Sequence, residues 1–319
     1  MGIELLGFQT TIAKPVSLSG IGVHSGKDVT LTFHPSDVDS GIVFQRVLPD
    51  GRTVEHRAIS SQVGNTDLCT ILGFSMATAV ATIEHVMAAV YALGLDNLTI
   101  EVTDAEMPIM DGSSAPFIEA IEQAGIKALA KKRRYIRILK PVRIESGASW
   151  AEFVPYELGM RFEVEIDFDC PLIGRQSWKG DMTPATFKNE LSRARTFGFM
   201  RDVERLWAAG FALGSSLENS VVISDDNTVV NVEGLRYAGD EFVRHKTLDA
   251  VGDLSLAGAP FIGCYRSYRG GHKMNANALK ALMADRSAYE LVETAMPRGR
   301  TYARDLVAVK EPEFAPWSA

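Results

Sequence analysis

The sequence predicts an α+β protein built of two similar two-layer α/β domains, with mainly antiparallel sheets and with helices packed between the domains. Three observations lead to this prediction. The chain has 319 residues, about the length of two ordinary domains. Strand-like segments precede helical segments in each half, and this order repeats. The tripeptide Lys-Pro-Val opens both halves, at 14–16 and at 140–142, although three matching letters alone are weak support.

The first half begins with segments that are rich in β-branched residues and partly alternate, as strands do. The expected strands lie at 29–33, 41–44, 67–72 and 98–102. A helix is expected from an N-cap at Thr82 to a terminating glycine, Gly94, because threonine caps helix starts and glycine ends them. A second helix should begin near Ser114, carry Pro116 in its first turn and end at Gly125.

The first domain is expected to span residues 1–127 and the second residues 134–290, followed by a C-terminal tail at 291–319. The run of four basic residues at 131–134 is interpreted as a solvated linker. Later strands are expected at 150–154 and 160–168, and helices at 184–195, 241–256 and 275–283. Residues 195–225 form a small βαβ insertion, whose apolar segments either fill a core or line a ligand channel.

The composition argues against several classes of protein. The net charge is −7, whereas a general nucleic-acid binder is normally basic. The three cysteines are odd in number and widely spaced, so they indicate neither a disulfide framework nor a zinc ribbon. The start of the chain lacks the pattern of a signal peptide, and no apolar run reaches the roughly 18–20 residues that span a bilayer. We therefore expect a cytoplasmic protein.

One histidine and two aspartates share a face of the helix expected at 241–256. His245 and Asp249 are four residues apart, which stacks them about 5–6 Å apart on one face, and Asp253 follows one turn later. A single rigid helix could therefore chelate a divalent metal. The competing interpretation is the solvated face of an amphipathic helix, although such a face more often mixes Glu, Lys and Arg.

Two further histidines stand where they could serve chemistry. Glu84-His85 lies in the first turn of a helix, where the helix dipole favours the neutral ring that metal binding needs. His272 follows two glycines, which predict a tight turn with the histidine at a loop tip. Local sequence alone favours a structural explanation for both. Together with the helix pair they nevertheless fit a zinc hydrolase with three N/O ligands, with Glu84 as general base and with His272, kept charged by Asp253, as general acid.

Five motifs carry a resemblance to a known family. They are GIGVHSGK at 20–27, TIEH at 82–85, PIMDGS at 108–113, SRARTFGFMRD at 192–202 and FVRHKTLDAVGD at 242–253. From about residue 8 to about residue 290, the chain resembles the bacterial UDP-3-O-acyl-N-acetylglucosamine deacetylases of lipid A biosynthesis. The strings are long and occur in the family's order.

The resemblance implies a metal-dependent deacetylase with defined site residues. The implied ligands of a divalent metal, usually zinc with Fe²⁺ as an alternative, are His85, His245 and Asp249. The implied general base is Glu84, the general acid is His272, and Asp253 sets the charge of that histidine. The implied residues beside the oxyanion and the metal are Thr196 and Lys246.

The resemblance also implies a nucleotide-sugar substrate with an acyl chain. The implied contacts are Phe168 on the uracil, Arg269 near the diphosphate, and Phe197 and Met200 in the insertion that would form the acyl passage. A monomer is expected, without nucleic acid or a transmembrane segment. The chain departs from the family pattern at Ser149 and at Lys273-Met274, which bears on nucleotide binding.

Two other classes of protein compete with this interpretation. A non-catalytic nucleotide-sugar-binding module with the same fold predicts loss of Glu84 or His272, and both residues are present. A metal-free acid–base enzyme with paired carboxylates leaves the spacing of His245 and Asp249 unexplained. We expect acetate release from the nucleotide sugar to separate these classes.

Overall fold

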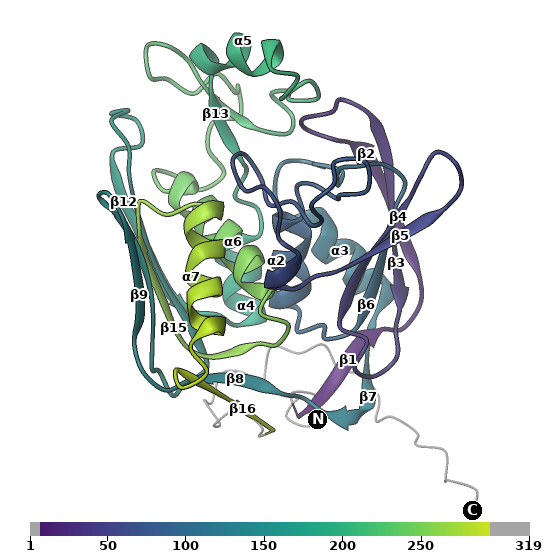
Figure 1. Ribbon diagram of the computed structural model, residues 1–319. Coiled ribbons are helices and arrows are strands. Elements are labelled where there is room, and N and C mark those ends of the chain that lie inside the picture. The colour runs from purple at the N-terminus through teal and green to yellow at the C-terminus, as the bar shows by residue number, and fades with distance from the viewer. Residues whose placement is uncertain (1–6, 294–319) are drawn as a thin grey trace, which may run out of the picture.

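The computed structural model describes residues 7–293. Two sheets face each other, and the main helices lie between them (Figure 1). This arrangement confirms the predicted α+β class. The expected C-terminal tail lies outside the described residues from residue 294 onward. Within residues 7–293, the helices are all too short or too polar to cross a membrane.

The first sheet has five strands in the order β2-β3-β6-β4-β5. The strands are β2 (Val16–Ile21), β3 (Asp28–Pro35), β4 (Ile42–Val47), β5 (Thr53–Arg57) and β6 (Leu98–Val102). Neighbouring strands are antiparallel, apart from the parallel pair β4 and β6. Alternate residues of β3, among them Leu31 and Phe33, are fully buried, because successive side chains of a strand point to opposite faces and one face covers the helices.

The second sheet follows the path β12-β11-β15-β10-β9, and β8 and β16 extend it beside β15. The strands are β8 (Tyr135–Ile138), β9 (Val142–Ser146), β10 (Ser149–Val154), β11 (Met160–Asp167), β12 (Arg175–Asp181), β15 (Phe261–Tyr268) and β16 (Tyr289–Val292). Read from β9, the path repeats the pairing of the first sheet: antiparallel, antiparallel, parallel, antiparallel. Val16 and Val142, which end the two Lys-Pro-Val repeats, are the first residues of β2 and β9. The topology therefore repeats as the sequence predicted.

The main helices lie in the space between the sheets (Figure 1). They are α2 (Glu84–Ala92), α3 (Ala115–Ala124), α6 (Glu241–Ser255) and α7 (His272–Ala284). Every residue of α2 except Tyr91 is buried, as expected of a helix that is apolar on nearly all sides. In chain order, α2 precedes β6 as α6 precedes β15, so the two central helices occupy equivalent places in the two halves.

The βαβ insertion of the second half is confirmed. It consists of β13 (Phe197–Phe199), α5 (Met200–Ala208) and β14 (Val221–Ile223), and its two strands pair in parallel. It stands above the gap between the sheets in Figure 1. Short turns complete the structure: a 3₁₀ turn at Ser60–Gln62, α4 (Pro184–Thr186) and a π-helical turn at Phe187–Leu191. The helix expected at 184–195 therefore ends four residues early.

The strand expected at 67–72 is wrong. This segment is a loop, and only Leu72 forms isolated bridges, to Val63 and Val80. The backbone N–H of Thr70 donates to the carboxylate of Glu84 at 2.9 Å instead of pairing with a strand. A side chain from the next helix thus takes the hydrogen bond that a strand partner would have taken.

Thr82 is also not the N-cap of α2. Its φ is 59°, and its hydroxyl donates to Glu106 at 3.0 Å, while Ile83 occupies the cap position without a side-chain bond. The expected helix end is confirmed, because Gly94 follows the helix with a φ of 72°, a conformation that glycine adopts without strain.

The solvated linker expected at 131–134 is only partly confirmed: Lys131, Lys132 and Arg134 are exposed, but Arg133 is not and the segment is not a free linker. Residues Ile126–Lys132 form β7, which pairs with β1 (Phe8–Ile12) in a separate two-stranded sheet. Arg133 is buried, and its Nε donates to Asp96 at 2.8 Å. A buried guanidinium is tolerated when a carboxylate pairs with it, and a count of basic letters cannot show that partner.

Candidate active site

The insertion, the two central helices and the loop before α2 surround a cavity of about 870 Å³. Its floor carries His85 from α2, together with His245 and Asp249 from α6. Phe168, Thr196, Phe197, Met200 and Arg269 are also in its walls. The residues predicted from both halves of the sequence therefore meet in one cavity.

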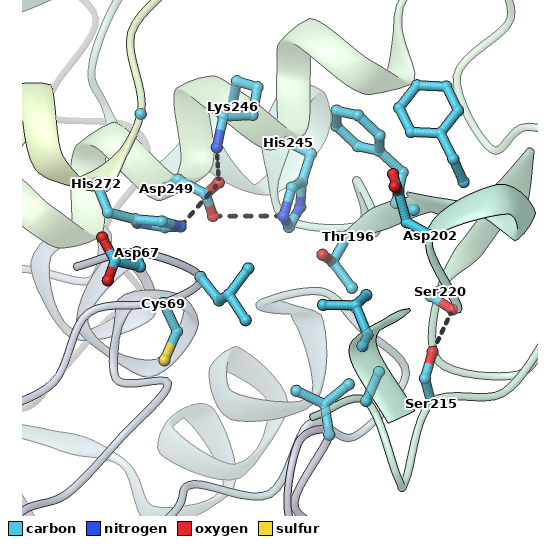
Figure 2. A pocket seen from close by; sticks show the side chains of 18 of the residues that line it. Asp67, Cys69, Thr196, Asp202, Ser215, Ser220, His245, Lys246, Asp249 and His272 are labelled. Atoms are coloured by element: carbon cyan, nitrogen blue, oxygen red, sulfur yellow. Dashed lines mark hydrogen bonds and ion pairs between the residues drawn. The ribbon is translucent and has the colours of Figure 1, made fainter. Parts of the chain in front are cut away.

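Two histidines and one aspartate converge at the floor of the cavity. The Oδ1 atom of Asp249 lies 3.3 Å from Nε2 of His245 and 3.6 Å from Nε2 of His85. One ligand atom of each residue lies within 4.8 Å of the other two. Figure 2 shows His245 and Asp249 side by side on α6, which is what their i, i+4 spacing predicts.

His245 is held as a neutral ring. Its Nδ1 lies 3.0 Å from the carbonyl oxygen of Ala194, a contact that places the ring proton on Nδ1 and directs the Nε2 lone pair toward Asp249. Burial lowers the pKa of His245 to about 4. The ring is therefore uncharged near neutral pH, which is the form that binds a metal.

Asp249 has the properties of a metal ligand. Burial opposes its ionisation, but the interactions with the His245 ring and with the ammonium group of Lys246 hold its pKa well below the usual value. Its Oδ2 accepts a hydrogen bond from Lys246 Nζ at 2.7 Å. Its Oδ1 is buried and accepts no hydrogen bond from any described residue. A buried carboxylate oxygen without a partner is costly, and a cation between the three ligand atoms would satisfy it.

The donor set also suits a divalent cation. Two imidazole nitrogens and one carboxylate oxygen form the kind of three-ligand set that catalytic zinc uses, with a fourth position left open. All three side chains are at most 5% exposed. These residues therefore fit a divalent metal.

A second group, Glu84, Asp253 and His272, lies beside the first, since Nε2 of His272 is 3.9 Å from Oδ2 of Asp249. Nδ1 of His272 lies 3.0 Å from Oδ2 of Asp253, and its Nε2 lies 4.0 Å from Oε1 of Glu84. Burial works against the charged ring, but the carboxylates of Asp253 and Glu84 outweigh it and raise the pKa of His272 to about 9. Burial also raises the pKa of Glu84. The group thus combines a carboxylate with a protonated imidazole.

The expected place of His272 at a loop tip is wrong. His272 is the first residue of α7, and Gly271 occupies the N-cap position in an extended conformation. The two glycines therefore end the loop that precedes the helix. The start of a rigid helix holds the histidine in a more defined place than a free loop would.

One glycine allows α2 of the first half and α6 of the second half to approach closely enough to bring both groups of side chains together. A Cβ atom on Gly252 of α6 would stand 2.0 Å from the carbonyl oxygen of Glu84, the first residue of α2. Only a residue without a side chain permits this approach. Glu84 and His85 are thereby placed against Asp249 and Asp253.

The residues expected to contact the substrate form the upper walls of the cavity. The ring of Phe197 packs edge-on against Phe168 and Phe242, with centroids 5.8 and 5.0 Å apart. Thr196 lines the same cavity as His245, and its backbone N–H donates to the carbonyl of Gly112 at 2.8 Å. The wall is therefore aromatic next to His245, whose ring lies 6.3 Å from that of Phe197.

Two expected substrate contacts lie nearer the solvent. Met200 is partly exposed on the first turn of α5. Arg269 donates to Asp167 at 3.0 Å and is also partly exposed. Both line the cavity.

Sequence reasoning missed several groups that hold the site residues. The carbonyl of Ala194 holds His245, and Asn275 donates to Oδ2 of Asp253 at 2.8 Å. Thr70 contacts carboxylates of both halves. A backbone carbonyl has no signature in the sequence, and the threonine lay in a segment that was expected to be a strand. The position of Asn275 one turn after His272 was the only usable signal.

Comparisons with known proteins agree with this geometry. A family model described as LpxC, UDP-3-O-acyl N-acetylglycosamine deacetylase, matches residues 9–284. The UDP-3-O-acyl-N-acetylglucosamine deacetylases of Brucella ovis and Brucella canis are each 59% identical to this chain over 287 residues, which is 90% of this chain and 99% of the relative. The enzyme of that name from Brucella melitensis biotype 2 is 58% identical over the same shares.

Proposed function

The chain belongs to the UDP-3-O-acyl-N-acetylglucosamine deacetylase family, and on that premise we propose that it removes the N-acetyl group of UDP-3-O-acyl-N-acetylglucosamine. Water cleaves the amide bond and gives UDP-3-O-acyl-glucosamine and acetate, the committed step of lipid A biosynthesis. The observation that carries the proposal is the meeting of two groups, His85/His245/Asp249 and Glu84/Asp253/His272, whose members other than Asp253 line one cavity.

We assign the metal to His85, His245 and Asp249, with zinc as the first choice and Fe²⁺ as the alternative. The bound ion would polarise the acetyl carbonyl as a Lewis acid. The three side chains hold their ligand atoms together from two helices, and the unpartnered Oδ1 of Asp249 supports this assignment.

Glu84 acts as general base in this proposal, and His272 acts as general acid. The Glu84 carboxylate takes a proton from the attacking water. The protonated His272, whose Nδ1 is held by Asp253, has Nε2 free to give its proton to the leaving amine. Burial of both groups strengthens their interaction with the charges that develop during the reaction.

Two further residues face the developing oxyanion in this proposal. Lys246 remains protonated, because Asp249 outweighs the burial of its ammonium group and raises its pKa. Thr196 lines the cavity together with His245 (Figure 2), and in this proposal its hydroxyl donates to the oxyanion. Together they would stabilise negative charge on the former carbonyl oxygen.

We place the rest of the substrate along the walls of the cavity. Phe168 would stack on the uracil and Arg269 would approach the diphosphate. Phe197 and Met200 belong to the insertion, which would hold the acyl chain. The apolar character of this wall supports an acyl chain there, because burying it removes apolar surface from water.

We further propose a cytoplasmic monomer with domains at 1–127 and 134–290. Within residues 7–293 all three cysteines are free, as a reducing compartment favours. Both functional groups are complete within a single chain, so the site needs no partner subunit. Size-exclusion chromatography with light scattering should give about 34.8 kDa, and a stable dimer would contradict the monomer.

A metal-free enzyme working with paired carboxylates is the alternative within the same cavity. It would give the unpartnered oxygen of Asp249 no role, so the metal enzyme is favoured. The test is acetate release from UDP-3-O-acyl-N-acetylglucosamine by the purified protein, with and without a chelator, beside a measurement of metal content. We expect close to one divalent ion per chain, and activity that disappears with the chelator and returns with Zn²⁺. Full activity in a metal-free sample would exclude the proposed mechanism.

A further inference from the structure

Thr70 contacts acid–base residues from both halves of the molecule. Its backbone N–H donates to Oε2 of Glu84 at 2.9 Å, and its hydroxyl donates to Oδ1 of Asp253 at 2.5 Å. Its carbonyl accepts the N–H of Ile83 at 3.3 Å, at the start of α2. The residue is 1% exposed. All of its polar groups are therefore engaged, and two of them hold carboxylates of the candidate site.

The hydroxyl of Thr70 completes the surroundings of Asp253. The other oxygen of that carboxylate, Oδ2, lies 3.0 Å from Nδ1 of His272 and accepts the side-chain amide of Asn275 at 2.8 Å. The amide oxygen of Asn275 in turn accepts the hydroxyl of Tyr265 at 2.7 Å. The second half of the chain thus holds one oxygen of Asp253, and the first half holds the other through Thr70.

This contact matters because the base and the acid come from different halves. Glu84 belongs to α2, while Asp253 and His272 belong to α6 and α7. Both must face the same amide group, and a misplacement of about 1 Å can reduce catalysis about 10²-fold. A carboxylate rotates easily about its last bond, so Asp253 needs partners on both oxygens to hold His272 at a fixed angle.

Building on the proposed deacetylase function, we propose that Thr70 is a positioning residue: its N–H fixes Glu84, and its hydroxyl fixes Asp253 and, through it, His272. The hydroxyl of a threonine with a purely local role would donate to the backbone of its own helix. Thr247 does so, since its buried hydroxyl donates to the carbonyl of Val243 one turn earlier in α6, at 2.8 Å. It makes a matched control, because it is equally buried and close to the site.

The experiment compares Thr70→Val, Thr70→Ser and Thr247→Val in the metal-loaded enzyme. Valine removes the hydroxyl and keeps the backbone N–H on Glu84. We expect Thr70→Val to lower kcat about 10–100-fold, as the loss of supporting hydrogen bonds around a metal site does, with KM and metal content unchanged. Serine should restore kcat to within about threefold, and Thr247→Val should keep wild-type kcat, because neither change removes the bond to Asp253.

Two further measurements show whether Thr70 acts through Asp253. Adding Thr70→Val to the Asp253→Asn variant should lower kcat little further than Asp253→Asn alone, because the residue through which Thr70 acts is already altered. Thr70→Ala removes the hydroxyl without adding a methyl group near the carboxylate. If the valine variant fails to fold, Thr70→Ala takes its place and should show the same loss of kcat.

Several outcomes would overturn the proposal. They are a kcat of Thr70→Val near that of the wild type, a serine variant as slow as the valine variant, a loss of metal that accounts for the loss of activity, and a full additional loss in the Asp253→Asn background. An inactive wild-type protein would instead refute the proposed function, so the two failures are distinguishable.

Discussion

Gly252→Ala tests how closely α2 and α6 must approach. The new Cβ would stand 2.0 Å from the carbonyl oxygen of Glu84 and 2.8 Å from its carbonyl carbon. Ordinary contact begins at 3.4 Å, so the helices must move apart by about 1.4 Å. The obstacle is backbone, and no change of rotamer can relieve it. The substitution therefore pushes Glu84 away from Asp253.

Two effects of opposite sign decide how far Gly252→Ala changes the free energy of unfolding. In a helix interior, alanine is about 1 kcal/mol more favourable than glycine, which alone would stabilise the variant. Overpacking a core costs about 1–3 kcal/mol, and a clash with backbone belongs at the upper end. We expect a net loss of about 2 kcal/mol in the free energy of unfolding, hence a Tm lower by several degrees. A shift of about 1 Å between base and acid should also lower kcat about 10²-fold.

Thermal unfolding measures the expected loss of stability, and acetate release measures the expected loss of kcat. Gly198→Ala in β13 is the control for stability, because its Cβ would meet no described atom within 4 Å; it should stay within about 0.5 kcal/mol of the wild type. A Gly252→Ala protein that is more stable than the wild type and has unchanged kcat would show that helix propensity outweighs the contact. The close approach at Gly252 would then not be what positions Glu84.

Three further predictions concern the buried charges. Glu84→Gln and His272→Gln should each lower kcat by roughly 10²–10⁴-fold while metal content stays near one per chain, and normal turnover in either would contradict its role. Although burial opposes the charged ring, Asp253 and Glu84 raise the pKa of His272 to about 9, so the proton donor is present below that pH and is lost as the pH rises through it. The kcat/KM profile should fall there, and a residual activity of His272→Gln that keeps this limb would argue against the assignment. Arg195→Met should destabilise the protein by about 3–5 kcal/mol in urea unfolding, because it leaves Glu241, whose side chain is 0% exposed, as an unpaired buried charge; a loss below about 1 kcal/mol would be inconsistent with this.

Much of the fold could be predicted because its signals are local. Helix ends at Gly94 and Gly125 follow from the conformational freedom of glycine. The i, i+4 spacing of His245 and Asp249 follows from the pitch of the helix. The repeated order of strands before helices also reflects short-range patterns, and the two sheets share their topology.

Two of the failed expectations concern segments whose partners are distant in the chain. The loop at 67–72 has the composition of a strand, yet Thr70 bonds to Glu84 and Asp253. The basic run at 131–134 looks solvated, yet Arg133 is buried against Asp96. In each case a long-range hydrogen bond outweighed local propensity. A buried polar group needs a partner, and here a distant part of the chain supplies it.

The amino-acid sequence determined which side chains could hold a metal and move protons, and it placed His245, Asp249 and Asp253 on one helix face through helical periodicity alone. Only the tertiary structure decided that Glu84 and His85, some 160 residues earlier in the chain, stand against them. The physical reason is the contact at Gly252, where α2 and α6 approach to backbone distance. Burial in the folded chain also keeps His245 neutral, and Oδ1 of Asp249 has no hydrogen-bond partner among the described residues.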